Sequence, residues 1–185
     1  MAKAPLDDRR RQLLALLLQE AGVEPLRTPI LPLPRGGPDG FPLSFSQERL
    51  WLIDQLEPGN IAYNVPVALR LDGDLRPALL ARTLEEIVRR HEVLRTRYSA
   101  GAAGAAGEMG PVQRVAPPSP LPLPRIDLAA LPARAREGEA RRLALAEGDR
   151  PFDLRRGPVV RARLLRLAAA EHALLLTVHH IAADG

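Results

Sequence analysis

Hydrophobic positions recur at two different periods along the 185-residue chain and divide most of it into helices and strands. Spacings of three and four residues predict a helix over 45–56 and a longer helix over 76–95. Alternation of apolar and polar positions predicts a strand over 62–71 with one apolar face. Two further apolar runs, 159–167 and 173–181, flank a short loop and predict a hairpin at the end of the chain.

Shorter elements are expected between these segments. Two short strands, one starting at Tyr98 and one over 112–115, enclose a loop at 100–110 that is rich in alanine and glycine. Proline cannot donate a backbone hydrogen bond, so the proline-rich segment that follows allows at most an edge strand over 121–126. A charged, alanine-rich helix is expected over 132–147, and the mixture of helices and strands indicates an α/β fold.

The first 41 residues follow a different pattern from the rest. Leucines at helical spacing predict a short helix over 7–21, within an N-terminal segment of residues 1–23. A helix of this length is marginal in water, so it needs a partner surface on this chain or on another protein. Residues 24–41 are rich in proline and glycine and are expected to form a linker, which leaves 42–185 as the folded domain.

The composition is that of an ordinary globular protein, with 46% hydrophobic and 26% charged residues. The absence of cysteine excludes disulfides and thiol catalysis, and it fits the cytoplasm as the expected location. No segment approaches the roughly 20 apolar residues of a membrane span, so no membrane partner is expected. The net charge is +4, but arginines alternate with acidic residues, as over 84–92, which favours a solvated surface over a nucleic-acid partner.

Two adjacent histidines, His179 and His180, end the last predicted strand and are followed by Asp184 and Gly185. Neighbouring strand residues point to opposite faces, so only one imidazole can face a given cavity. With an unperturbed pKa of about 6.5, an imidazole can take a proton and give it back. The carboxylate can hold an arginine or a histidine, and the glycine allows backbone or substrate to come close.

Two simpler interpretations of these histidines compete with a catalytic one. Most histidines near apolar strands are structural and have their hydrogen bonds satisfied within the fold. A metal site is the second alternative, because histidine is a common metal ligand. The chain has no cysteine, and His91 and His172 show no ligand spacing relative to the terminal pair, so no metal is expected.

Three segments carry motifs that are more specific than the elements around them. Residues 44–51 read SFSQERLW, which is similar to Ser-x-Ala-Gln-x-Arg-Leu-Trp with Ser46 where alanine is usual. Residues 90–98 read RHEVLRTRY, similar to Arg-His-x-x-Leu-Arg-Thr-x-Phe, and residues 179–185 match His-His-x-x-x-Asp-Gly at every fixed position. In this order, over 41–185, the motifs resemble the condensation domain of non-ribosomal peptide synthetases.

The resemblance implies a fold like that of chloramphenicol acetyltransferase, in which two similar lobes form a V with the active site between them. This chain corresponds to the N-terminal lobe only, a two-layer α/β lobe of mixed sheet and helices that ends at the histidine motif. The second lobe is missing, so we expect the isolated fragment to be inactive.

The activity implied by the resemblance is amide-bond formation by acyl transfer. The amine of an aminoacyl thioester on a downstream peptidyl carrier protein attacks the acyl or peptidyl thioester on an upstream carrier protein. Both substrates are carried on the phosphopantetheine arms of these partners, so no bound cofactor is expected. The helix over 7–21 is then either a docking element for an upstream synthetase subunit or a helix that packs on the domain.

The resemblance also implies roles for single residues of the terminal motif. His180 matches the catalytic position, either as a general base or as a group that orients the amine and the intermediate. His179 is expected to face away as a structural residue, and Gly185 to support the motif.

Asp184 matches a residue that supports the motif through a salt bridge to an arginine. Arg90 is the first candidate partner and Arg95 the second. They are five positions apart, about 140° around one helix, so at most one of them should reach the carboxylate.

Other functions share parts of this pattern. The spacing from His179 to Asp184 also fits glycerolipid acyltransferases, but the other motifs favour the synthetases. An epimerisation domain shares the histidine motif, although residues 44–51 and 63–66 are more similar to a condensing domain. A heterocyclisation domain would carry aspartate in place of the first histidine. From a different class, a non-catalytic carrier-protein-binding module is an alternative.

Overall fold

The computed structural model describes Leu13, Leu16, Leu17 and residues 40–101 and 110–183. The chain divides into two units, Met1–Gly37 and Pro38–Gly185, and the fold below is that of the second. The helix expected over 7–21 and the linker expected over 24–41 lie almost entirely outside the described residues and stay predictions.

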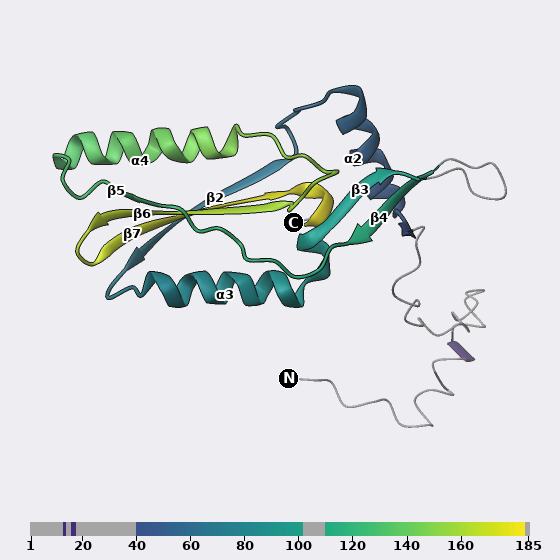
Figure 1. Cartoon of the computed structure of the whole chain (residues 1–185), viewed down its shortest axis with the longest axis horizontal. Coiled ribbons are helices and arrows are strands. Elements are labelled where there is room, and N and C mark those ends of the chain that lie inside the picture. Colours follow the sequence, from purple (N-terminus) through teal and green to yellow (C-terminus); the bar gives the residue numbers. More distant parts are fainter. Residues whose placement is uncertain (1–12, 14–15, 18–39, 102–109, 184–185) are drawn as a thin grey trace. The chain divides into compact units, whose positions relative to one another are not determined.

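A four-stranded mixed sheet forms the centre of the second unit, with strand order β2–β7–β6–β5 (Figure 1). The first three of these strands pair antiparallel, whereas β5 pairs parallel with β6. The predicted terminal hairpin is therefore confirmed as β6–β7, and β7 lies inside the sheet with a partner on each side. The strands are β2 (Asn64–Asp72), β5 (Arg125–Asp127), β6 (Val160–Ala168) and β7 (Glu171–His179).

Helices cover both faces of this sheet. Helix α3 (Pro77–Arg90) and helix α4 (Ala133–Gly148) lie on opposite sides of it in Figure 1. Each helix buries its own apolar cluster against the strands, because alternate strand residues point to opposite faces. The expected mixed sheet with helices is confirmed. Because helices cover both faces of the sheet, the unit has three layers where two were expected. The α3 cluster contains Leu84, Val88, Leu121, Val160, Ala162 and Leu174, and the α4 cluster Leu128, Leu143, Leu165, Leu167 and Leu175.

A smaller sheet and one helix complete the unit. Helix α2 (Phe45–Leu56) has the predicted bounds, and it begins with a capping box in which the Ser44 side chain accepts from the backbone of Gln47. A third apolar cluster joins α2, the small sheet and Ile181, the second residue after β7, so this core packs against the histidine motif. Its members are Leu43, Leu50, Tyr98, Phe152, Leu154, Val159 and Ile181. The small sheet has strand order β1–β4–β3, with β1 (Phe41–Pro42), β3 (Thr96–Ala100) and β4 (Pro111–Val115).

The prediction of one long helix over 76–95 is wrong at the C-terminal end. Helix α3 stops at Arg90, His91 takes an extended backbone conformation (φ −98°, ψ 91°), and a 3₁₀ turn, η1, follows over Glu92–Arg95. Apolar spacing alone continues through this break and does not show it. Arg90 and Arg95 therefore lie on different elements, and the 140° separation derived from one helix does not apply.

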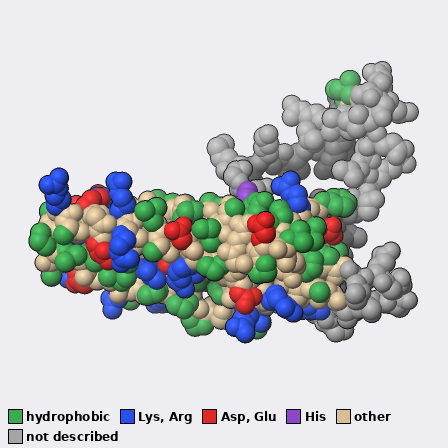
Figure 2. Space-filling model, turned by 90° about the horizontal axis from the view of Figure 1, so that it is seen from above, with side chains coloured by type: hydrophobic (Ala, Val, Ile, Leu, Met, Phe, Trp, Pro, Cys, Tyr) green, Lys and Arg blue, Asp and Glu red, His purple; other side chains and the backbone are tan. Residues whose placement is uncertain are grey.

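The surface of this unit has an exposed apolar edge strand and a mixed distribution of charges. Strand β2 is an edge of the sheet, and its apolar residues Val65, Val67 and Leu69 are 41–46% exposed. Basic and acidic side chains are interspersed with hydrophobic ones on the face shown in Figure 2. Among the described residues, no helix is long and apolar enough to cross a membrane.

Candidate active site

The two histidines lie where β7 ends, between its two neighbours in the sheet. The backbone N–H of His179 donates to the carbonyl of Val159 at 2.9 Å, and that of His180 donates to the carbonyl of Tyr63 at 2.8 Å. Consecutive residues are thus fixed to opposite sides of the strand. This double attachment sets the position from which each imidazole projects.

His179 is a buried residue, with 3% of its surface exposed. Its ring meets Phe152 edge-on, with the ring centroids 5.9 Å apart, and lies 6.5 Å from the ring of Tyr63. Its Nδ1 accepts a hydrogen bond from the backbone N–H of Ile181 at 3.1 Å, so its proton belongs on Nε2. Burial, and next the neighbouring His180, lowers the pKa of His179 to about 4. This imidazole is therefore neutral near pH 7.

His180 is exposed and belongs to a different element. It is the first residue of the 3₁₀ turn η2 (His180–Ala182), whereas His179 is the last residue of β7. The side chains of His179 and His180 therefore diverge because the strand ends between them, in addition to the alternation of strand residues. Its Nδ1 contacts the backbone carbonyl of Ala183. A carbonyl can only accept, so Nδ1 carries a proton, and in the neutral ring Nε2 is then the basic nitrogen. Within the described residues, that nitrogen has no hydrogen-bond partner.

His180 lines a pocket of about 430 Å³. The pocket brings together all three sequence motifs: the start of α2 from the first, Val93 from the second, and the η2 turn from the third. In the sequence these segments are separate, and the first motif carried no predicted role in a pocket. Its lining residues are Ser44, Ser46, Gln47, Arg49, Leu50, Val93, His180, Ile181, Ala182 and Ala183.

Gln47 holds the α2 wall of this pocket. Its Oε1 accepts from the Ser44 backbone at 3.0 Å and from the Gln113 side chain at 3.3 Å, and its Nε2 donates to the hydroxyl of Tyr98 at 3.5 Å. Tyr98 is fully buried, and burial raises its pKa to about 12. The side chain of Arg49 has no ion pair within the described part of the chain, which leaves a cation on the same wall.

The two arginines proposed as partners of Asp184 have other contacts within the described residues. Arg90 is exposed on α3 and its Nε lies 2.6 Å from the carboxylate of Glu86. Arg95 is nearly buried: it lies 3.4 Å from Glu92 and donates to the carbonyl of Ala116. Asp184 and Gly185 lie outside the described residues, so the salt bridge stays a prediction. In the parts of the chain that the structure describes, no group of three or more acidic or histidine side chains could hold a metal ion.

Comparison with known protein families gives a direct match. The family model named Condensation domain matches residues 39–185. Among solved structures, the starter condensation domain of rhizomide synthetase RzmA is 27% identical, with a TM-score of 0.68 over 78% of this chain and 34% of that chain. The first condensation domain of the CDA synthetase is 28% identical, with a TM-score of 0.66 over 78% of this chain and 36% of that chain.

Curated relatives are much longer than this chain. Chondramide synthase cmdD of Chondromyces crocatus is 43% identical over 91% of this chain, which spans 4% of that protein. Phosphinothricin tripeptide synthetase PhsC of Streptomyces viridochromogenes is 42% identical over 98% of this chain and 16% of its own length. The probable non-canonical nonribosomal peptide synthetase CymA of Salinispora arenicola is 39% identical over 93% of this chain and 2% of its own length.

Proposed function

Because this chain belongs to the condensation-domain family, we propose that its pocket is one wall of an active site for amide-bond formation in non-ribosomal peptide synthesis. One observation carries this proposal: three motifs that are far apart in the sequence line a single pocket around the exposed imidazole of His180. The chain spans about a third of the solved condensation domains, so we assign it the N-terminal lobe of the complete domain.

The reaction proposed is aminolysis of a thioester. The amine nitrogen of the acceptor bonds to the acyl carbon of the donor, and the bond from that carbon to sulfur breaks. The amine loses one proton, and the departing thiolate gains one. The intermediate carries an oxyanion, so the site must supply both a proton acceptor and hydrogen-bond donors.

The described residues supply both kinds of group. In the neutral ring of His180, with Nδ1 donating to Ala183, Nε2 is the nitrogen that accepts a hydrogen bond, or the proton, from the attacking amine. On the α2 wall, Ser46 and Arg49 line the same pocket, and their side chains carry a hydroxyl and a guanidinium that can donate. A guanidinium stays charged at any physiological pH, so Arg49 favours a developing negative charge.

The partners follow from the form of the substrates. Donor and acceptor are carried on phosphopantetheine arms of an upstream and a downstream carrier protein, so the proposed site needs no cofactor of its own. We place the reaction in the cytoplasm, in keeping with the absence of cysteine. Docking of the N-terminal segment on an upstream synthetase subunit is part of the same proposal.

The test is product formation measured by mass spectrometry. Acyl-loaded and aminoacyl-loaded carrier proteins are mixed with the 185-residue chain and, in parallel, with a chimera in which residues 39–185 replace the matching third of the first condensation domain of the CDA synthetase. An amide product on the downstream carrier protein from the chimera is expected. Carrier-protein binding without product would instead identify a binding module, and epimerised aminoacyl groups without an amide would identify an epimerisation domain.

A further inference from the structure

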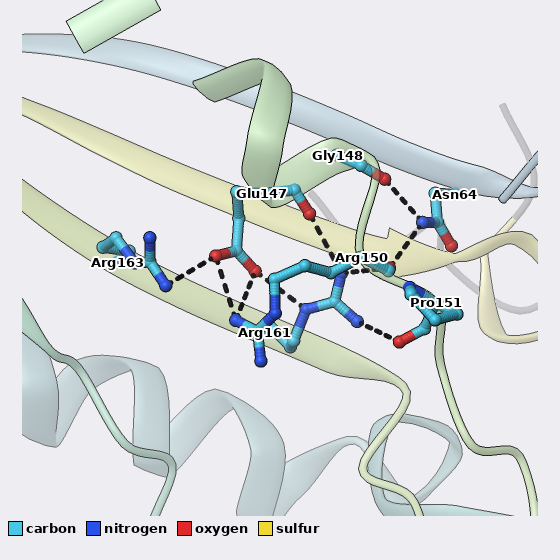
Figure 3. A network of polar contacts seen from close by, with 7 residues as sticks. All are labelled: Asn64, Glu147, Gly148, Arg150, Pro151, Arg161 and Arg163. Carbon is cyan, nitrogen blue, oxygen red and sulfur yellow. Dashed lines mark hydrogen bonds and ion pairs between the residues drawn. The ribbon is translucent and has the colours of Figure 1, made fainter. Parts of the chain in front are cut away.

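A buried carboxylate lies at the end of α4, outside the pocket that His180 lines. The side chain of Glu147 is 3% exposed and occupies the last turn of the helix. This is an unfavourable place for an anion, because the helix dipole is negative there and burial removes water. Three arginines compensate: Arg161 at 2.8 Å, Arg163 at 3.1 Å and Arg150 at 3.2 Å (Figure 3).

The cluster is ionised. Burial opposes the charge of Glu147, but the hydrogen bond from Arg161 and the charges of Arg150 and Arg163 outweigh it and bring its pKa below the usual value. Burial also lowers the pKa of Arg161. That pKa begins so far above neutrality that the guanidinium keeps its proton.

Arg161 does more than neutralise a charge, because its guanidinium organises the chain that leaves α4. It donates to the carbonyl of Glu147 at 3.0 Å, of Arg150 at 2.7 Å and of Pro151 at 3.1 Å (Figure 3). Asn64 on β2 donates to the carbonyls of Gly148 at 2.6 Å and Arg150 at 2.9 Å. One cation and one amide thus satisfy the helix end and fix the path toward Phe152.

Phe152 connects this cluster to the catalytic motif. The guanidinium carbon of Arg161 lies 3.8 Å from the centroid of the Phe152 ring, a cation–π contact. The Phe152 ring in turn meets His179 edge-on, at an interplanar angle of 84°. Nδ1 of His179 receives the N–H of Ile181 inside the η2 turn. A continuous series of contacts therefore runs from Glu147 to the turn that begins with His180.

We propose that Arg161, held by Glu147, is a positioning residue for the reaction: through Phe152 it fixes the ring of His179 and thereby the turn that presents His180 to the pocket. This inference rests on the proposed function, since it assigns a support to the same catalytic residue. It concerns residues outside the pocket, and none of the three sequence motifs contains Arg161, Glu147 or Phe152.

Arg163 provides a matched control. It lies on the same strand, two residues along and on the same face, and it pairs with the same carboxylate. Within the described residues, the side chain of Arg163 forms an ion pair with Glu147. It makes neither the contact of Arg161 with Phe152 nor the hydrogen bonds of Arg161 to the carbonyls at the end of α4. Arg161→Lys and Arg163→Lys keep the charge in both places, but a lysine cannot reproduce the planar fork of Arg161.

The primary test is nitrogen-15 NMR of the histidine rings in the 185-residue chain, which requires no catalytic activity. We expect Arg161→Lys to shift the ring signals of His179 and to weaken its single-tautomer pattern, whereas Arg163→Lys leaves both histidines as in wild type. Phe152→Leu, which keeps the arginine and its hydrogen bonds, should reproduce the shift. Unchanged His179 signals in Arg161→Lys and Phe152→Leu would overturn the proposal.

A kinetic test separates positioning from stability. In the chimera, we expect Arg161→Lys to lower kcat about ten- to hundredfold while KM for the acceptor carrier protein stays within about twofold, because small misplacements of a catalytic group reduce kcat. Arg163→Lys should keep wild-type kcat. Equal kcat values for the two variants would contradict the inference. If the wild-type chimera makes no amide, the proposed function fails, and the NMR comparison still decides the positioning role.

Discussion

His179 and His180 are adjacent in the chain, yet their Nδ1 atoms have opposite hydrogen-bonding roles. Nδ1 of His179 accepts from the backbone of Ile181, whereas Nδ1 of His180 donates to the backbone of Ala183. One histidine is thereby a buried acceptor within the η2 turn, and the other is exposed and lines the pocket. The division of labour in the motif follows from these two local hydrogen bonds.

This arrangement predicts the tautomer of each ring. Long-range proton–nitrogen spectra of the 185-residue chain at pH 7.5 should show His179 with its proton on Nε2 and His180 with its proton on Nδ1. His91, on the surface after α3, serves as a reference in the same spectrum. The same tautomer at both positions would show that the η2 hydrogen bonds do not hold in solution.

The buried histidine also predicts a pH dependence of stability. The pKa of His179 is about 4 in the folded chain, against about 6.5 for an unfolded histidine, so folding favours the neutral form. The contribution of neutral His179 to the free energy of unfolding is fully present above pH 6.5. As the pH falls from 6.5 to 4, the unfolded chain takes up a proton that the folded chain does not, which costs up to about 3 kcal/mol.

Urea unfolding at pH 7.5 and pH 4.5 measures this effect. Carboxylates with lowered pKa values, such as Asp127 and Glu147, also lose stabilising charge in acid, so wild type must be compared with a variant. His179→Asn removes the titrating ring but keeps a side-chain acceptor. We expect the variant to lose less stability than wild type between the two pH values. An equal loss in both proteins would mean that His179 titrates normally.

A third prediction concerns the tie between β2 and the end of α4. Asn64→Ala removes both hydrogen bonds to the carbonyls of Gly148 and Arg150, and it should lower the free energy of unfolding by about 1–3 kcal/mol. Gln55→Ala removes an exposed side-chain contact with Asp54 and should change the free energy of unfolding by no more than about 0.5 kcal/mol. Urea denaturation compares the two, and equal losses would contradict the role given to Asn64.

Local sequence signals account for the parts of the fold that could be predicted. Ser44 and Gln47 form a capping box within three residues, and the two apolar runs of the terminal hairpin are nearly contiguous, so both elements follow from short-range chemistry. The end of α3 at Arg90 could not be predicted, because Leu94 continues the helical spacing past the break.

The pocket and the Arg161–Glu147 pair could not be predicted, because both depend on contacts between segments that are distant in the sequence. The pocket joins Ser46, Val93 and His180, and only the pairing of strands and the packing of α2 bring them together. Arg161 belongs to a strand in which arginines recur, so nothing local distinguishes it from a surface charge. Its partner Glu147 is 14 positions away on a helix.

The central claim is that the second imidazole of the pair performs or directs the transfer. The measurement that tests it most directly is the rate of amide formation by His180→Ala in the chimera, beside His179→Asn and with the fold of each checked by circular dichroism. The account predicts a fall of about 10²–10⁴-fold for His180→Ala and a smaller loss for His179→Asn, which keeps an acceptor for the η2 turn. A folded His180→Ala chimera that forms product at the wild-type rate would contradict it.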